Sequence, residues 1–120
     1  MATILYIEDN DDNAYMLRGR LEMNGHAVFI AEDGERGIAQ AAAIQPDIVI
    51  MDLVLPDIDG WEATREIKAC QATAHIPIVV LSSNASTEDR RKSLEAGASD
   101  YDTKPVDFNR LQRKIMACLS

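Results

Sequence analysis

Carboxylate side chains follow two short apolar runs of this sequence, and their type and spacing are suited to metal and phosphoryl chemistry. Asp52 ends the run 48–51, and Glu8 and Asp9 end the run 4–7. A short, β-branched apolar run is typical of a strand buried on both faces of a parallel sheet. Open α/β sheets place their ligands at the carboxyl ends of such strands. Alone, Asp52 would be interpreted as a turn residue. Its function therefore depends on which other residues lie near it in the fold.

The three carboxylates point to a divalent cation. If the first and third strands are neighbours, Glu8, Asp9 and Asp52 meet in one crevice. Carboxylates crowded in one pocket repel one another and partly protonate unless a cation neutralises them. Mg²⁺ binds through one or two carboxylates, with water and phosphate completing its octahedron. The sequence therefore predicts a Mg²⁺ site here, whereas Asp11 and Asp12 are interpreted as charges that complement a helix dipole.

A hydroxyl and an ammonium group follow the last two strands. Ser82 ends the fourth apolar run, and Lys104-Pro105 follows the fifth strand. In a sheet of order 2-1-3-4-5, both would flank Asp52 on the side away from Glu8 and Asp9. Phosphoryl transfer requires a nucleophile, positioning and charge neutralisation. Each residue alone is an ordinary cap or loop residue, but their joint placement predicts that Asp52 accepts a phosphoryl group.

Strand-like and helix-like segments alternate along the whole chain and would position these residues. Strands are expected at 4–8, 27–31, 47–52, 76–82 and 100–103, and helices near 12–24, 34–44, 60–69, 87–96 and 107–119. Five strand–helix units in so short a chain predict an α/β fold. We expect a three-layer, doubly wound, flavodoxin-like, five-stranded parallel sheet of order 2-1-3-4-5.

The last two expected helices differ in what they can bury. The last is strongly amphipathic, with Leu111 and Ile115 in its apolar stripe. The fourth is polar over 87–92, and only Leu94 and Ala96 offer apolar contact. A helix with so little to bury is weakly held, which suits an element that moves. A solvated helix with no role is an equal interpretation.

Helix ends carry their own signals. Gly25, after Asn24, and Gly97 stand where left-handed C-caps are expected. Ser86 followed by Asp89 matches a capping box. The N-cap expected for the last helix is Asp107.

Composition restricts the class of protein. The chain has 120 residues, a length that forms one hydrophobic core, so one domain over 1–120 is expected. Its formal net charge is −8. No apolar stretch approaches the roughly 18 residues of a membrane span, and the start lacks signal-peptide features, so we expect a cytoplasmic protein. The negative charge disfavours direct binding of nucleic acid or of a membrane surface. Cys70 and Cys118 lack metal-ligand spacing and are expected to be thiols.

Together these motifs resemble the receiver domain of bacterial two-component response regulators over essentially the whole chain. The residues that carry the resemblance are Glu8-Asp9, Asp52, Pro56, Gly60, Ser82, Tyr101 and Lys104-Pro105. The resemblance implies that Asp52 becomes a 4-aspartylphosphate, taking the phosphoryl group from a phosphohistidine. The donor would be a sensor histidine kinase or a histidine phosphotransfer protein. It also implies a regulator that catalyses only its own phosphorylation and dephosphorylation.

The resemblance assigns a ligand set to the metal. Asp9 and Asp52 would bind Mg²⁺ directly, Glu8 would act largely through water, and Val54 would offer its backbone carbonyl. Lys104 would pair with the phosphoryl oxygens, and the bond between it and the following proline is expected to be cis.

The resemblance also implies a switch. Ser82 would swing in to the phosphoryl oxygens, and Tyr101 would turn inward into the vacated space. The roughly two negative charges gained at Asp52 would shift the surface of the fourth helix, fifth strand and fifth helix. That shift would control the docking of a downstream protein.

Two groups of residues are expected to adjust this function. Ser83 stands where the family usually has Ala or Gly, and we hypothesise that Ser83, Val54 and Asn84 set the lifetime of the phosphoryl group. The outer face of the first helix would dock the phosphodonor. The partner-docking residues are expected to be Tyr15, Arg18, Gly19 and Pro105. For the glycine, a tolerated helix defect is an equal interpretation.

Other functions share parts of this pattern. A flavin-binding flavodoxin-like protein would have the same fold, but the acidic residues after the first strand would repel a flavin phosphate. An aspartyl-phosphate phosphatase would carry a carboxylate where this chain has Val54. A receiver acting as a phosphate-independent binding module stays open because of Ser83. No output domain is expected after the last helix, and both a standalone protein and a receiver from a hybrid kinase remain open.

Overall fold

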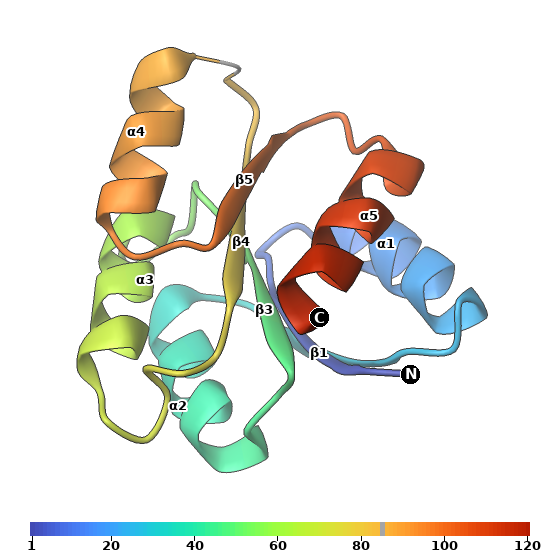
Figure 1. Ribbon diagram of the computed structural model, residues 1–120, viewed down its shortest axis with the longest axis horizontal. Coiled ribbons are helices and arrows are strands. Elements are labelled where there is room, and N and C mark those ends of the chain that lie inside the picture. Colours follow the sequence, from blue (N-terminus) through green and yellow to red (C-terminus); the bar gives the residue numbers. More distant parts are fainter. Residues whose placement is uncertain (85) are drawn as a thin grey trace.

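Five parallel strands form one sheet in the computed structural model, which describes residues 1–84 and 86–120 (Figure 1). The strands are β1 (Thr3–Ile7), β2 (Ala27–Ala31), β3 (Ile48–Asp52), β4 (Ile78–Ser82) and β5 (Asp100–Thr103). The helices are α1 (Asp11–Met23), α2 (Gly34–Ile44), α3 (Gly60–Ala69), α4 (Thr87–Glu95) and α5 (Phe108–Leu119). The strand order is β2-β1-β3-β4-β5, which confirms the predicted topology.

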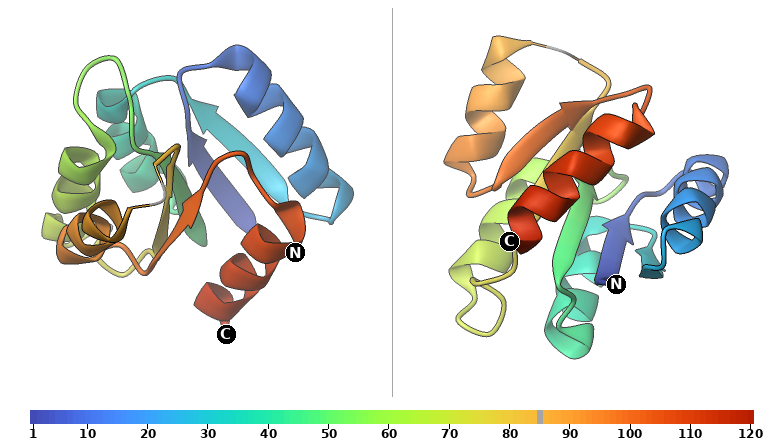
Figure 2. Two further views of the ribbon diagram at one scale, coloured as in Figure 1. Left: turned by 90° about the horizontal axis from the view of Figure 1, so that it is seen from above. Right: turned by 45° about the vertical axis from the view of Figure 1, so that its right-hand side comes forward.

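Helices cover both faces of the sheet (Figures 1 and 2). Successive side chains of a strand point to opposite faces, so each strand contributes to two cores. One core joins the strands to α1 and α5 and includes Leu21, Leu111 and Ile115. The other joins them to α2 and α3 and includes Ala41 and Ile67. The helix α4 lies beside α3, on the same side of the sheet (Figures 1 and 2).

The start of β4 differs from the prediction for a definable reason. The strand begins at Ile78 rather than Ile76, because Pro77 has no N–H to donate to a neighbouring strand. The N–H of Ile76 instead donates to the carbonyl of Thr73, at 3.0 Å. The carbonyl of Pro77 still accepts from Val49 of β3, at 2.9 Å, so the proline marks the edge of the ladder.

The predicted helix ends are confirmed with one change. Gly25 and Gly97 have φ of +88° and +109°, as expected for left-handed caps. Asp107 caps α5 by accepting from the backbone N–H of Arg110. Ser86 caps α4 by accepting from the N–H of Asp89, at 3.0 Å. The carboxylate of Asp89, however, accepts a hydrogen bond from the hydroxyl of Ser82, so the capping box is only half formed.

The apolar contribution expected from α4 is smaller than predicted. Leu94 is 38% exposed, so it offers only part of its side chain for contact, while Ala96 is buried. Within α4 itself the buried residue is Ser93. The turn of the helix about its axis puts a serine, not a leucine, against α3.

Among residues 1–84 and 86–120 no helix has the length and apolar character needed to cross a bilayer. The longest, α1, has 13 residues. A span requires about 20.

Candidate functional site

Three carboxylates meet where β1 and β3 end. Ile7 pairs with Met51 across the two strands, so the residues that follow them lie side by side. Glu8 and Asp52 are 2% and 6% exposed, whereas Asp9 is open to solvent. One carboxylate oxygen from each of the three lies within 4.8 Å of the others. The structure thus brings together the residues that the sequence predicted would meet.

Gly60 lets the start of α3 approach the end of β3. Its N–H donates to the carbonyl of Leu53, at 2.8 Å. A Cβ at this position would collide with the backbone of Asp52 and Leu53. A larger residue would therefore push α3 away or displace Asp52 from the other carboxylates.

Lys104 connects the carboxylates at the ends of β1 and β3 to the end of β4. Its Nζ lies 2.8 Å from Oε1 of Glu8 and 2.9 Å from Oδ1 of Asp52. Its backbone N–H donates to the carbonyl of Ser82, at 2.7 Å, which fixes the loop after β5 against the end of β4. The Lys104-Pro105 bond is cis, as predicted. Lys104 thus contacts the residue expected to accept the phosphoryl group.

The electrostatics of the cluster follow from its burial. Burial raises the pKa of Asp52 to about 6, despite the opposing effect of Lys104 and with a further contribution from Glu8. Although burial opposes it, the hydrogen bond from Lys104 lowers the pKa of Glu8. Burial lowers the pKa of Lys104, but its hydrogen bonds to Glu8 and Asp52 outweigh this effect, so the pKa is raised. One ammonium group therefore faces several carboxylates and leaves negative charge at the crevice.

This donor set fits a magnesium ion. Mg²⁺ prefers oxygen ligands and usually keeps several waters, so a cluster with one exposed member is well suited to it. The raised pKa of Asp52 shows that the crevice disfavours the charged carboxylate, and a divalent cation would reverse that penalty. Asp9, at the mouth of the crevice, is accessible to such an ion.

Tyr6, in β1, forms a hydrogen bond with one carboxylate of the cluster and was not identified from the sequence. Its hydroxyl donates to Oε1 of Glu8, at 3.0 Å, and the ring is fully buried. Burial, followed by the charge of Glu8, raises the pKa of Tyr6, which keeps the hydroxyl a donor. Residues two apart on a strand share a face, so the Tyr6–Glu8 spacing was a signal that could have found it.

The two hydroxyls expected to take part in the switch both contact Asn84. Ser82 Oγ accepts from the N–H of Asn84 at 3.0 Å and lies 3.3 Å from its carbonyl oxygen. It also lies 3.2 Å from Oδ2 of Asp89. Tyr101 is buried, and its hydroxyl donates to the carbonyl of Asn84. In this structure Tyr101 therefore already points inward, and Ser82 is engaged by the loop and α4.

The residues expected to adjust phosphoryl lifetime are accessible but are not joined to one another by side-chain hydrogen bonds among the described residues. Val54 is 70% exposed, and Ser83 and Asn84 are also exposed. Their effect on lifetime stays a prediction.

The expected docking face has the predicted orientation. Leu17 and Leu21 of α1 are buried, while Tyr15 is 77% exposed. Arg18 forms an exposed ion pair with Glu22, at 3.2 Å. A Cβ at Gly19 would meet no atom within 4 Å. The face is open to a partner, and its use for docking stays a prediction.

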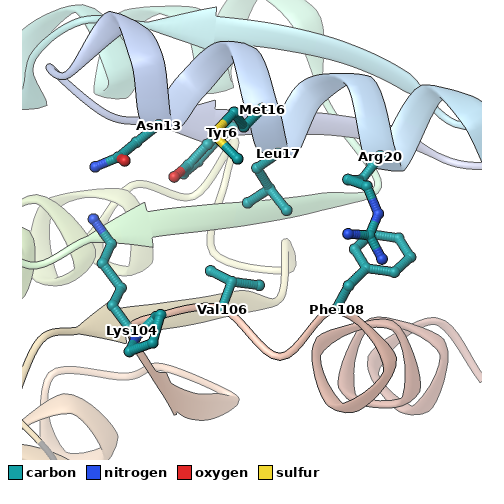
Figure 3. Close-up of a pocket in the computed structure, with 9 residues that line it drawn as sticks. Tyr6, Asn13, Met16, Leu17, Arg20, Lys104, Val106 and Phe108 are labelled. Atoms are coloured by element: carbon teal, nitrogen blue, oxygen red, sulfur yellow. The ribbon is translucent and has the colours of Figure 1, made fainter.

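A groove of about 400 Å³ runs from Lys104 between α1 and the start of α5 (Figure 3). Arg20 and Phe108 close its far end, with the guanidinium carbon 4.6 Å from the centre of the ring. The residues lining it are Tyr6, Asn13, Met16, Leu17, Arg20, Lys104, Pro105, Val106 and Phe108. The groove joins the exposed side of α1 to Pro105, which is itself exposed.

The chain is similar to known proteins over nearly its full length. The family model for the response regulator receiver domain matches residues 4–116. Protein PilH of Pseudomonas aeruginosa is 38% identical over 120 residues, which cover 100% of this chain and 99% of PilH. The transcriptional regulatory protein KdpE of Escherichia coli K12 is 39% identical over 119 residues. Those residues are 99% of this chain but 52% of KdpE, so the chain spans about half of that relative.

An experimental structure has the same fold. The receiver domain of sensor histidine kinase PA1611 from Pseudomonas aeruginosa PAO1 superposes with a TM-score of 0.91 and 36% sequence identity. The match covers 98% of this chain and 97% of that one. The crystal structure of that domain has a magnesium ion coordinated in its active-site cleft.

Proposed function

The chain belongs to the response regulator receiver domain family, and from this premise we propose that it is a phosphoacceptor switch in a two-component phosphorelay. The observation that carries the proposal is the direct contact of Lys104 with Asp52, inside a cluster of three carboxylates. We propose further that residues 1–120 form a single receiver domain that works in the cytoplasm without binding nucleic acid directly.

In the proposed reaction Asp52 is the nucleophile. A carboxylate oxygen of Asp52 attacks the phosphorus of a phosphohistidine on a histidine kinase or a histidine phosphotransfer protein. A P–O bond forms while the P–N bond breaks, and the electron pair of that bond stays on the imidazole nitrogen, which takes up a proton. Lys104, which now pairs with Asp52 and Glu8, can exchange these partners for the phosphoryl oxygens.

Asp9, Asp52 and the carbonyl of Val54 would hold Mg²⁺, with Glu8 acting through water. Bound there, the ion would neutralise charge on the transferring phosphoryl group. The three carboxylates, which lie close together, would hold the ion beside the nucleophile, and the hydroxyl of Tyr6 orients Glu8.

Loss of the phosphoryl group resets the switch. A water molecule attacks phosphorus, the bond from phosphorus to the Asp52 oxygen breaks, and inorganic phosphate leaves with the carboxylate restored. We propose that Ser83, Val54 and Asn84 control access of this water, since all three have exposed side chains. In this proposal the chain catalyses only its own phosphorylation and dephosphorylation.

The signal would leave through α4, β5 and α5. Ser82 would move to the phosphoryl oxygens, and Tyr101 and the surface beyond it would adjust to that movement. This surface would then bind or release a downstream protein. The phosphodonor would dock elsewhere, on the α1 face that includes Tyr15, Arg18 and Gly19 and near Pro105, where the groove beside Lys104 opens (Figure 3).

Intact-mass measurement tests the proposal. Acetyl phosphate and Mg²⁺ should add one phosphoryl group to the wild type and none to Asp52→Asn. Asp57→Asn is the matched control, because it removes an aspartate that lies outside the carboxylate cluster and accepts from the backbone N–H groups of Gly34 and Glu35 at the start of α2. It should be phosphorylated like the wild type. Chelation of Mg²⁺ should abolish labelling. Equal labelling of Asp52→Asn and wild type would overturn the proposal.

A further inference from the structure

Asp89 makes a hydrogen bond through its backbone N–H, its carbonyl and its carboxylate, and together these bonds join α4 to the end of β4. Its backbone N–H donates to Oγ of Ser86, at 3.0 Å, which caps α4. Its carbonyl accepts from Oγ of Ser93, at 2.8 Å, one turn further along the helix. Its carboxylate lies 3.2 Å from the hydroxyl of Ser82 at the end of β4. One residue in the first turn of α4 is therefore bound to its own cap, to the helix interior and to the sheet.

The carboxylate of Asp89 contacts Ser82 instead of the backbone N–H of the cap residue Ser86. In a capping box, the acidic side chain at the third helical position accepts from the backbone N–H of the cap residue. In this chain Oδ2 of Asp89 faces the hydroxyl of Ser82, seven residues earlier, and Ser82 is almost fully buried. A buried hydroxyl and a partly buried carboxylate form a stronger hydrogen bond than two neutral groups do.

This contact competes with the reaction. A serine hydroxyl has one proton and can donate it to one acceptor at a time. Two acceptors lie within reach of that proton in this structure, the carboxylate of Asp89 at 3.2 Å and the carbonyl of Asn84 at 3.3 Å. If Ser82 is to donate to phosphoryl oxygens on Asp52, it must release both. An acceptor that holds the hydroxyl in the resting arrangement raises the free energy of the arrangement that the phosphoryl group requires.

We propose that Asp89 is a positioning residue that holds Ser82, and with it the start of α4, in the resting state. A phosphoryl group on Asp52 would compete with Asp89 for the same proton. This inference rests on the proposed function and adds a residue that sets how readily the switch changes state. Asp89 acts through Ser82 and does not itself contact the carboxylate cluster among the described residues.

The same residue connects the sheet to the single tryptophan of the chain. Ser93, which donates to the carbonyl of Asp89, accepts from Nε1 of Trp61 on α3, at 3.0 Å. Lys92 Nζ lies 5.0 Å from the centre of the indole ring. The C-terminal end of α4 lies next to the start of α3 (Figures 1 and 2). Because the chain has one tryptophan, its fluorescence reports on the contact between α3 and α4 without a label.

The test compares the phosphorylation rates of wild type, Asp89→Ala and Glu88→Ala with acetyl phosphate and Mg²⁺, followed by intact mass. Asp89→Ala should be phosphorylated about two- to tenfold faster, the factor that corresponds to one net hydrogen bond. Glu88→Ala is the matched control, because it removes a carboxylate from the same helical turn that pairs with Arg91 rather than Ser82. Its rate should equal that of the wild type.

Two further measurements separate a positioning role from a structural one. In a Ser82→Ala background, adding Asp89→Ala should leave the rate unchanged, because the two residues act through one contact. Without phosphodonor, the Trp61 emission of Asp89→Ala should shift towards that of the phosphorylated wild type, and that of Glu88→Ala should not. Asp89→Asn, which keeps the shape of the side chain, decides the question if Asp89→Ala does not fold.

A rate for Asp89→Ala equal to the wild type, or an increase that persists without Ser82, would overturn the inference. Either result leaves the proposed function intact as long as the wild type is phosphorylated. A wild type that takes up no phosphoryl group would instead overturn the proposed function.

Discussion

Helices α4 and α5 both flank β5, yet they are attached to the domain in different ways. From α5, Leu111 and Ile115 are fully buried in the core shared with α1. From α4, the buried residue is Ser93, whose hydroxyl joins Asp89 to Trp61. Apolar burial is lost when a helix moves, whereas hydrogen bonds can be exchanged for others of similar strength. Thus α5 is held by apolar packing, whereas α4 is held by hydrogen bonds that can be exchanged.

The first prediction tests this contrast with one residue type. Leu111→Ala should lower the free energy of unfolding by about 2–5 kcal/mol, because it leaves a cavity in a closed core. Leu94→Ala, in α4, should cost less, about 1 kcal/mol or below, because its side chain is 38% exposed and leaves no closed cavity when it is truncated. Urea unfolding followed by circular dichroism measures both. Similar losses for the two leucines would show that α4 is as firmly packed as α5.

The difference between the helices is only partly visible in the sequence. The amphipathic stripe of α5 and the polar start of α4 follow from helical periodicity. The alternation of strand and helix segments predicts the doubly wound sheet and its order. Periodicity does not fix the rotation of a helix that has no apolar stripe. The choice between Leu94 and Ser93 as the buried residue of α4 was therefore beyond it.

The candidate site shows the same division. Glu8, Asp9 and Asp52 could be placed together because strand ends meet at one edge of a parallel sheet. The contact of Asp89 with Ser82 could not, because a capping box is an equally good use of the same carboxylate. Which acceptor a side chain selects depends on the distance between two elements, and that distance is set by packing far from either residue.

The second prediction tests the attachment of α4 itself. Ser93→Ala should lower the free energy of unfolding by about 1 kcal/mol, because the indole N–H of Trp61 loses its partner and the interior of α4 loses a hydrogen bond. The fluorescence of Trp61 should change in the folded protein. Ser99→Ala, at an exposed serine, serves as the control and should change neither quantity. An unaltered Trp61 spectrum in Ser93→Ala would mean that this hydrogen bond does not hold the two helices together.

The helix α2 packs into a core through Ala41, but its start has a third and weaker kind of attachment, an exposed charge. The backbone N–H groups of Gly34 and Glu35 donate to the two oxygens of Asp57, both at 2.8 Å. Although slight burial opposes it, these hydrogen bonds lower the pKa of Asp57. Asp57 lies in the loop after β3, so one solvent-exposed carboxylate joins the loop beside the candidate site to the start of α2.

The third prediction is the smallest and depends on pH. A carboxyl group whose pKa is lower in the folded than in the unfolded state stabilises the fold above its unfolded pKa, about 3.9, and this stabilisation disappears as the pH falls through the folded-state pKa. Asp57→Asn should therefore be less stable than the wild type by about 0.5 kcal/mol at pH 7. The difference should shrink as the pH falls below about 4. Urea unfolding of both proteins across this range measures it, with Asp59→Asn as the control, because Asn and Asp cap a helix equally well. A deficit that stays constant with pH would mean that the charge of Asp57 does not hold α2, and that its start depends on apolar packing as α5 does.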